Sequence, residues 1–113
     1  MKEIKAIIQP FMADQVIDGL RAMPGLPGVT VSEVTGFGHG RALGEPTMPD
    51  EPPLFGVKKI KLEIVVPDEL VEKVVQLIVE RGHSGNPGDG KIFISAVDDV
   101  VKIRTGEHAV DAL

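Results

Sequence analysis

The sequence of 113 residues contains no cysteine, no tryptophan and no tyrosine, and it has only four phenylalanines. The absence of cysteine excludes a disulfide framework and thiol chemistry. Because aromatic residues are scarce, valine, isoleucine and leucine must build the core, which suits a β-sheet covered by helices. No N-terminal apolar run is long enough for a signal peptide or a membrane span, so we expect a cytoplasmic protein without direct membrane insertion.

Positive charge is also in deficit, with 12 lysines and arginines against 17 acids and a formal net charge of −5. Nucleic acids and anionic membranes both require net or clustered positive charge, so neither is expected as the main partner. A locally basic pocket remains compatible with this balance. The length predicts a single domain over residues 1–113.

The apolar pattern predicts one structural plan used twice: strand, proline, amphipathic helix, glycine-containing turn and strand. The first copy covers residues 4–8, 12–23 and 29–35, and the second covers residues 57–66, 68–82 and 92–97. This order predicts an α+β ferredoxin-like sandwich, in which two helices cover one face of an antiparallel sheet. Ile7 and Val65 would lie on the other face. An apolar face needs a partner, so we expect oligomerisation.

Residues 38–57 are rich in glycine and proline and show no periodicity. A loop this long in so small a domain is usually functional or disordered, and we interpret it as a long mobile loop. A C-terminal tail begins at about residue 105, after the apolar run Val100, Val101 and Ile103.

The sequence offers little for catalysis. His39, His83 and His108 are far apart and none forms a pair at metal-ligand spacing, although His39 is a candidate ligand. The serines lie in no setting typical of a catalytic triad. We therefore expect a protein that is not an enzyme.

Two glycine-rich segments, residues 36–41 and 85–91, are more informative. Glycines let backbone N–H groups approach an anion, and a nearby lysine adds charge. Either segment alone is more often a plain turn, and neither matches a Walker A or Rossmann spacing. Lys102 and Arg104 alternate with Ile103, which predicts both cations on one side of an extended segment. They could decorate an exposed edge, but together with two glycine-rich segments they favour a phosphate site.

Five stretches resemble the PII signal-transduction proteins, and together they cover nearly the whole chain. The most specific is Ser84-x-x-x-Gly88-Asp89-Gly90-Lys91-Ile92-Phe93-Ile94-x-x-Val97, which resembles the C-terminal signature of that family. Residues 4–11, 29–38 and 61–68 resemble its first three strands, and residues 103–107 resemble its tail.

The resemblance implies a homotrimer that binds ATP or ADP, with Mg²⁺ and often 2-oxoglutarate, in clefts between subunits. One side of each cleft would be lined by Ile7, Gly36, Phe37, Gly38 and Val65, with Thr30 near its base. Gly88, Asp89, Gly90 and Lys91 would hold phosphates, joined from across the interface by Lys102 and Arg104. The long loop would contact a transporter or an enzyme and regulate it.

Some positions depart from the family pattern. His39 and Gly40 stand where the family has Arg and Gln, and that Gln helps to coordinate the Mg²⁺ through which 2-oxoglutarate binds. Glycine has no side-chain oxygen, which argues against conventional 2-oxoglutarate sensing. Without tyrosine, the loop cannot be uridylylated. Lys102 replaces a common arginine, which should weaken phosphate contact. The alternative is a PII-like trimer that binds a metal ion or small anion through His39 and His108, linked to metal efflux or bicarbonate transport.

Overall fold

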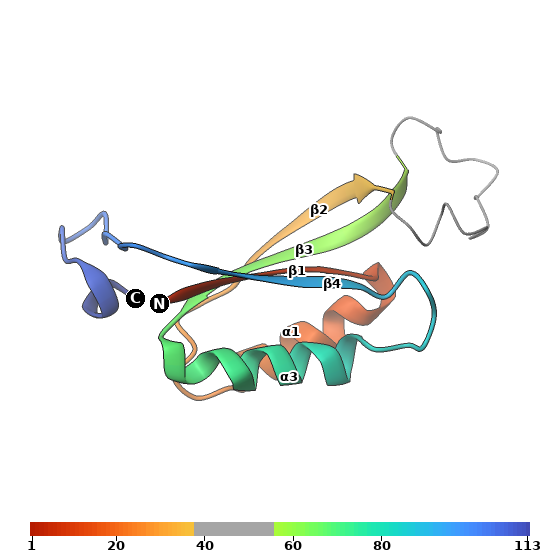
Figure 1. Ribbon diagram of the computed structural model, residues 1–113, viewed down its shortest axis with the longest axis horizontal. Helices are drawn as coiled ribbons and strands as arrows, with labels where there is room; N and C mark the ends of the chain where they lie inside the picture. Colours follow the sequence, from red (N-terminus) through yellow and green to blue (C-terminus); the bar gives the residue numbers. More distant parts are fainter. Residues whose placement is uncertain (38–55) are drawn as a thin grey trace.

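The computed structural model describes residues 1–37 and 56–113. Four antiparallel strands form one sheet in the order β2-β3-β1-β4. The strands are β1 (Lys2–Ile8), β2 (Thr30–Gly36), β3 (Val57–Val66) and β4 (Gly90–Ala96). Helices α1 (Ala13–Arg21) and α3 (Val71–Gly82) both lie on one face of the sheet (Figure 1). Short 3-10 turns occupy Pro10–Met12, Asp68–Leu70 and Ala109–Ala112. The expected α+β ferredoxin-like sandwich is confirmed.

The core lies between the central strands and the two helices. Alternate residues of β1 and β3 point toward the helices, and the register places Ile4 opposite Ile64 and Ala6 opposite Leu62. The helices complete the core at helical spacing, with buried residues Ala13, Val16, Leu20, Val74 and Ile78. Fully burying an aliphatic side chain stabilises a fold by about 1.5–3 kcal/mol. Strands β1 and β3 therefore anchor the sheet, and β2 and β4 form its edges.

The two helices are joined by a reciprocal pair of hydrogen bonds. Gln15 Nε2 donates to the carbonyl oxygen of Arg81 over 2.8 Å, and Arg81 Nη1 donates to the carbonyl oxygen of Gln15 over 3.0 Å. The Arg81 side chain lies over Gly19, where an added Cβ would be 2.9 Å from Nε. As predicted, α3 ends at Gly82, which is buried. These contacts fix where the chain leaves α3 and begins its turn toward β4.

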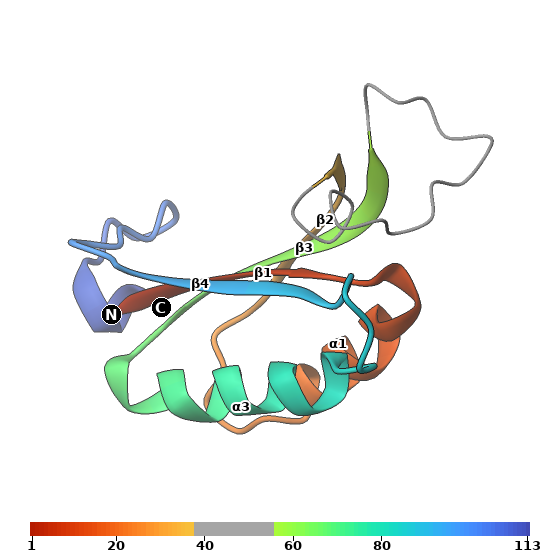
Figure 2. The ribbon, with the colours of Figure 1, turned by 45° about the vertical axis from the view of Figure 1, so that its right-hand side comes forward.

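One face of the sheet points away from the two helices (Figure 2). The strand register shows that this open face is more charged than the sequence suggested. Ile7 and Val65 lie on it, as predicted. However, Ile7 stands between Lys61 on β3 and Lys91 on β4, and Val65 stands opposite Glu3. This open face is therefore a mixed surface and not an apolar one, because the lysines of three strands alternate with its aliphatic residues.

Residues 99–109, which include the start of the C-terminal tail, form a small hairpin, which we call the tail hairpin. It lies at the end of the sheet where the N-terminus also lies (Figure 1). A bridge joins Val101 to His108, and the amide of Lys102 donates to the carbonyl oxygen of Glu107 over 2.8 Å. The amide of Gly106 donates to the carbonyl oxygen of Lys102 over 2.7 Å. The prediction of an extended segment at Lys102–Arg104 is therefore wrong: the chain turns there.

The apolar run of the tail does not enter the core. Ile103 is fully exposed, and the exposed fraction of Val101 is 52%.

Among residues 1–37 and 56–113, no helix combines the length and the apolar character needed to cross a membrane.

Candidate functional site

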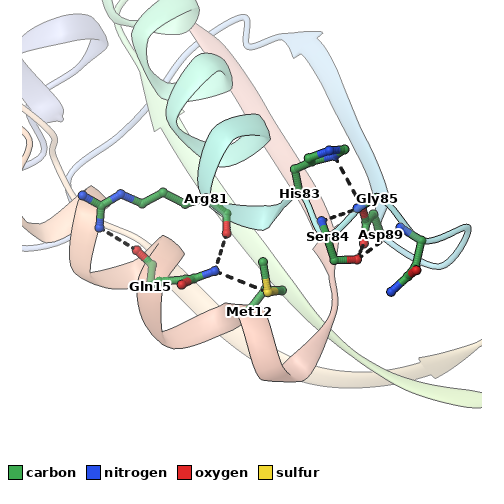
Figure 3. Close-up of polar contacts among 8 residues, drawn as sticks. Met12, Gln15, Arg81, His83, Ser84, Gly85 and Asp89 are labelled. Carbon is green, nitrogen blue, oxygen red and sulfur yellow. Dashed lines mark hydrogen bonds and ion pairs between the residues drawn. The ribbon is translucent and has the colours of Figure 1, made fainter.

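Asp89 folds the glycine-rich turn between α3 and β4 (Figure 3). Its Oδ2 accepts hydrogen bonds from the amides of Ser84 and Gly85 over 2.8 and 2.9 Å, and its Oδ1 accepts one from the Ser84 hydroxyl. His83 Nδ1 lies 3.6 Å from Oδ2. The Ser84 hydroxyl bond, the amide bonds and His83 together hold the pKa of Asp89 below its ordinary value, against a smaller opposing effect of burial. The Asp89 carboxylate thus joins the end of the turn to its start at Ser84 and Gly85.

This arrangement of Ser84, His83 and Asp89 does not activate a nucleophile. A serine nucleophile needs a base that accepts its proton. Here Ser84 and His83 both contact the same carboxylate, and the serine hydroxyl donates to Asp89 and not to the imidazole. The cluster therefore shapes the turn.

Gly90 lies where β4 begins, next to β1. Its φ is +102°, and an added Cβ would lie 1.7 Å from the carbonyl oxygen of Ile7, closer than any side chain allows. Because Gly90 has no side chain, β4 can pair with β1 here, and the next residue, Lys91, lies directly opposite Ile7 on the open face. A cavity of about 370 Å³ runs from here between α3 and β4. It is lined by Ile7, Ile8, Val75, Ile78, Val79, Gly82, His83, Asp89, Gly90, Lys91, Ile92 and Ile94.

Lys59 ties the turn to the sheet, a role that sequence reasoning missed. Its Nζ donates to the carbonyl oxygen of Gly88 over 2.8 Å and to Gln9 Oε1 over 3.1 Å. The available signal was the alternation in β3, which puts Lys59 and Lys61 on the open face and Lys58 on the other. Lys59 therefore places a second cation beside the glycine-rich turn, near Lys91.

Gly36 and Phe37 end β2 on the same side of the molecule as this turn. Gly36 pairs with Val57, and Gly56 packs so closely that an added Cβ would lie 2.3 Å from the carbonyl oxygen of Gly36. The Phe37 side chain is 77% exposed. Gly38 and His39 lie outside the described residues, as does nearly all of the long loop expected at 38–57.

The residues around the glycine-rich turn and the end of β2 form one group, which we call the turn-side half. Its members are Ile7, Gly36, Phe37, Lys59, Gly88, Asp89, Gly90 and Lys91.

A second group, the tail-side half, lies at the other end of the sheet; its members are Thr30, Val65, Lys102 and Arg104. Thr30 pairs with Glu63. A cavity of about 400 Å³ at this end is lined by Glu3, Pro27, Gly28, Thr30, Glu63, Val65, Ala112 and Leu113. Lys102 and Arg104 are carried by the tail hairpin at the same end (Figure 1). Lys102 is half-buried and Arg104 is exposed.

Within one chain, two of the residues expected to line one cleft, Gly36 and Val65, lie far apart. Gly36 pairs with Val57 at the first residue of β3, whereas Val65 lies near the end of this ten-residue strand. At about 3.3 Å per residue, the separation is roughly 26 Å. The register therefore places Gly36 and Val65 toward opposite ends of the open face. Ile7 and Thr30 lie between them, because they pair with Lys61 and Glu63 of β3.

Metal-binding chemistry has no support in the part of the chain that the structure describes. That part contains no group of three or more histidine, aspartate or glutamate side chains placed to hold a metal ion. His108 Nδ1 lies 2.7 Å from Asp99 Oδ2, so this histidine is engaged in a polar pair of the tail.

Comparison with known proteins agrees with this arrangement of elements. The family model described as "Nitrogen regulatory protein P-II" matches residues 1–107. Over 113 residues the chain is 42% identical to a nitrogen regulatory protein P-II of Azospirillum brasilense, with all of both chains covered. It is 45% identical, again with all of both chains covered, to the proteins of that name from Microchaete diplosiphon and Synechocystis sp.. The chain therefore belongs to the nitrogen regulatory protein P-II family.

Proposed function

We propose that this protein is a PII signalling regulator that binds an adenine nucleotide, ATP or ADP, between the protomers of a homotrimer. The observation that carries the proposal is the separation of Lys91 from Lys102 and Arg104. Lys91 is the second residue of β4, whereas the hairpin that carries Lys102 and Arg104 lies beyond the other end of that strand (Figure 1). One chain therefore does not bring these three cations to a single polyphosphate. A cyclic assembly can, because each head-to-tail contact brings the turn-side half of one protomer against the tail-side half of the next.

The turn-side half has the chemistry of a phosphate site. Gly88 and Gly90 have no Cβ, and Lys59 and Lys91 supply positive charge beside them on a protein whose net charge is −5. Glycine-rich backbone with adjacent cations is typical of anion-binding sites. In this proposal Asp89 shapes the turn and does not contact phosphate through its carboxylate, because that carboxylate already accepts hydrogen bonds from Ser84 and Gly85.

The tail-side half suits the rest of a nucleotide. Thr30 and Glu63 offer hydrogen-bonding groups to a sugar or a base, and Val65 offers apolar contact. Lys102 and Arg104 bring cations to phosphates held by the neighbouring protomer. Arg104 can do so through a planar, bidentate fork, whereas Lys102 acts as a point charge.

The regulatory output would pass through the segment that joins β2 to β3, of which residues 38–55 lie outside the described residues. Gly36 and Gly56, which flank it, belong to or adjoin the turn-side half. ATP and ADP would change the ensemble of this loop only as far as they bind its states with different affinity. The loop would then contact a transporter or an enzyme in the cytoplasm. Mg²⁺ would accompany the phosphates, and Gly40 argues against conventional 2-oxoglutarate binding.

Calorimetric titration of the full chain with ATP, ADP and AMP tests the proposal. ATP and ADP should bind, and AMP should bind more weakly because it has a single phosphate. Lys91→Ala and Arg104→Ala should each weaken ATP binding by about tenfold or more, since each removes a charge-assisted contact. Lys58→Ala, on the opposite face of β3, is the matched control and should bind like the parent protein. Absence of heat with millimolar ATP would overturn the proposal.

A further inference from the structure

The carboxylate of Asp99 joins the two ends of the tail hairpin. Its Oδ1 accepts hydrogen bonds from the amides of Val100 over 2.9 Å and Ala109 over 3.1 Å, and its Oδ2 lies 2.7 Å from His108 Nδ1. Val100 precedes the bridge between Val101 and His108, and Ala109 follows it. One exposed side chain therefore holds the strands that enter and leave the hairpin.

Ala109 shows that this closure holds the backbone in an unfavourable conformation. Its φ is +60°, and it is the single residue other than glycine with positive φ in the described part of the chain. A side chain with a Cβ disfavours this region, so surrounding contacts must hold it there. The amide of Ala109 donates to both the carbonyl oxygen of Val100 and Asp99 Oδ1. Asp99 is thus part of what holds the strained residue in place.

The hairpin closed in this way carries the two cations of the tail-side half. Both the amide and the carbonyl of Lys102 are used within it, by bonds to Glu107 and Gly106 over 2.8 and 2.7 Å. Arg104 lies in the turn between them. Fixing the two ends of the hairpin therefore fixes the backbone from which both cations project.

We propose that Asp99 is a positioning residue for the polyphosphate of a bound nucleotide: by closing the tail hairpin, it presents Lys102 and Arg104 in a fixed geometry. This inference rests on the proposed function. A ligand that meets an ordered hairpin does not lose affinity to the ordering of that segment, which is the general advantage of preorganisation.

Asp99 could act through its negative charge or by positioning the hairpin. These two roles predict opposite effects of Asp99→Ala on ATP affinity. Hydrogen bonds from His108 and from the amides of Val100 and Ala109 hold the pKa of its carboxyl below the ordinary value, so it is ionised at neutral pH. A negative charge near a phosphate site repels the ligand, so if charge alone mattered, Asp99→Ala would tighten binding. If positioning matters, Asp99→Ala weakens binding, and Asp99→Asn, which keeps an oxygen for the two amides, retains most of the affinity.

The test measures ATP affinity by calorimetry in the full chain. We expect Asp99→Ala to weaken binding by about tenfold, because the hairpin must then be ordered by the ligand. Asp98→Ala is the matched control: it removes an equal charge one residue away and should not weaken binding. In the background Lys102→Ala plus Arg104→Ala, Asp99→Ala should have no further effect, because a positioning residue acts only through the groups that it positions.

Hydrogen exchange of the same variants gives a reading that does not need nucleotide. Asp99→Ala should speed exchange at the amides of Lys102, Gly106 and Ala109 while leaving β1 and β3 unchanged. Should that variant fail to fold, His108→Ala replaces it, with a smaller expected loss of affinity because only the Oδ2 contact is removed.

The outcomes separate this inference from the function on which it rests. Unchanged or tighter ATP binding by Asp99→Ala, or the same loss of affinity with and without the two cations, would overturn the positioning role while leaving the nucleotide site standing. Absence of ATP binding by the parent protein would overturn both.

Discussion

Gly90 lies where β4 begins beside β1, and its position has no room for a side chain. Gly90→Ala must move β4 away from the carbonyl of Ile7, because the new Cβ would lie 1.7 Å from that oxygen at a φ of +102°. We expect it to lower the free energy of unfolding by about 3 kcal/mol. Gly85 has a φ of +88° but open space around it, so Gly85→Ala should cost only about 1 kcal/mol. Urea denaturation of both variants measures the difference, and equal losses would contradict the clash.

Asp89 predicts a pH dependence of stability. Its folded-state pKa lies below the ordinary value of 3.8, chiefly because of the Ser84 hydroxyl bond and then the amides of Ser84 and Gly85. The stabilisation is therefore fully present above the unfolded-state pKa and is lost as pH falls through the folded-state value. Asp89→Asn should lower the stability at neutral pH and flatten the loss below about pH 4. Urea denaturation between pH 2 and 6 measures this, with Asp98→Asn as the control. If the stability of Asp89→Asn fell with decreasing pH as steeply as that of the parent protein, Asp89 would not be a source of the pH dependence.

At the scale of single residues, α3 ends at Gly82 as predicted. Contacts made only in the folded chain were not predictable. Gly90 requires glycine because of the nearby carbonyl oxygen of Ile7 and a φ of +102°. The bonds of Asp89 to Ser84 and Gly85 exist only once the turn has closed, and the bond of Lys59 to Gly88 joins segments far apart in sequence. Neither spacing nor charge could assign those contacts in advance.

The turn between α3 and β4 depends on its attachment to β3. Lys59→Met keeps most of the aliphatic stem but removes the bonds from Nζ to Gly88 and Gln9. We expect faster hydrogen exchange of amides in residues 85–90 and, if the proposed site is correct, ATP binding weakened by about tenfold. Lys58→Met, on the other face of the same strand, should change neither quantity. Similar exchange in the two variants would show that Lys59 does not hold the turn.

The strands and helices themselves followed from hydrophobic periodicity. The alternation at Ile4, Ala6 and Ile8 predicted β1, and the helical spacing of Val74 and Ile78 predicted α3, because each pattern buries one face. The same reasoning gave a wrong prediction for the tail hairpin. Ile103 between two cations alternates as a strand would, but no sheet lies beside it, and the bond from Gly106 to Lys102 turns the chain instead.

At the scale of the whole molecule, sequence reasoning proposed site residues but could not place them relative to one another. Nothing in the order of residues reveals that Val65 and Gly36 lie at opposite ends of β3, since that depends on the register of β2 against β3. Once the register is known, the separation becomes the main argument for an assembly. If the proposed site is correct, a second copy of the chain would complete it across a head-to-tail contact.

Mixed assemblies test this division directly. Lys91→Ala damages the turn-side half of every protomer, and Arg104→Ala damages the tail-side half, so each variant alone should lack tight ATP sites. When the two variants exchange subunits, an intact site forms wherever the turn-side half of an Arg104→Ala protomer meets the tail-side half of a Lys91→Ala protomer. Random exchange at equal amounts should restore about a quarter of the interfaces. Calorimetry measures the restored sites, and native mass spectrometry verifies that subunits have exchanged. A protein carrying both substitutions, mixed with itself, should restore none. If exchanged trimers also show none, Lys91 and Arg104 do not serve one ligand across an interface, because a site shared between neighbours must reappear whenever two undamaged halves meet.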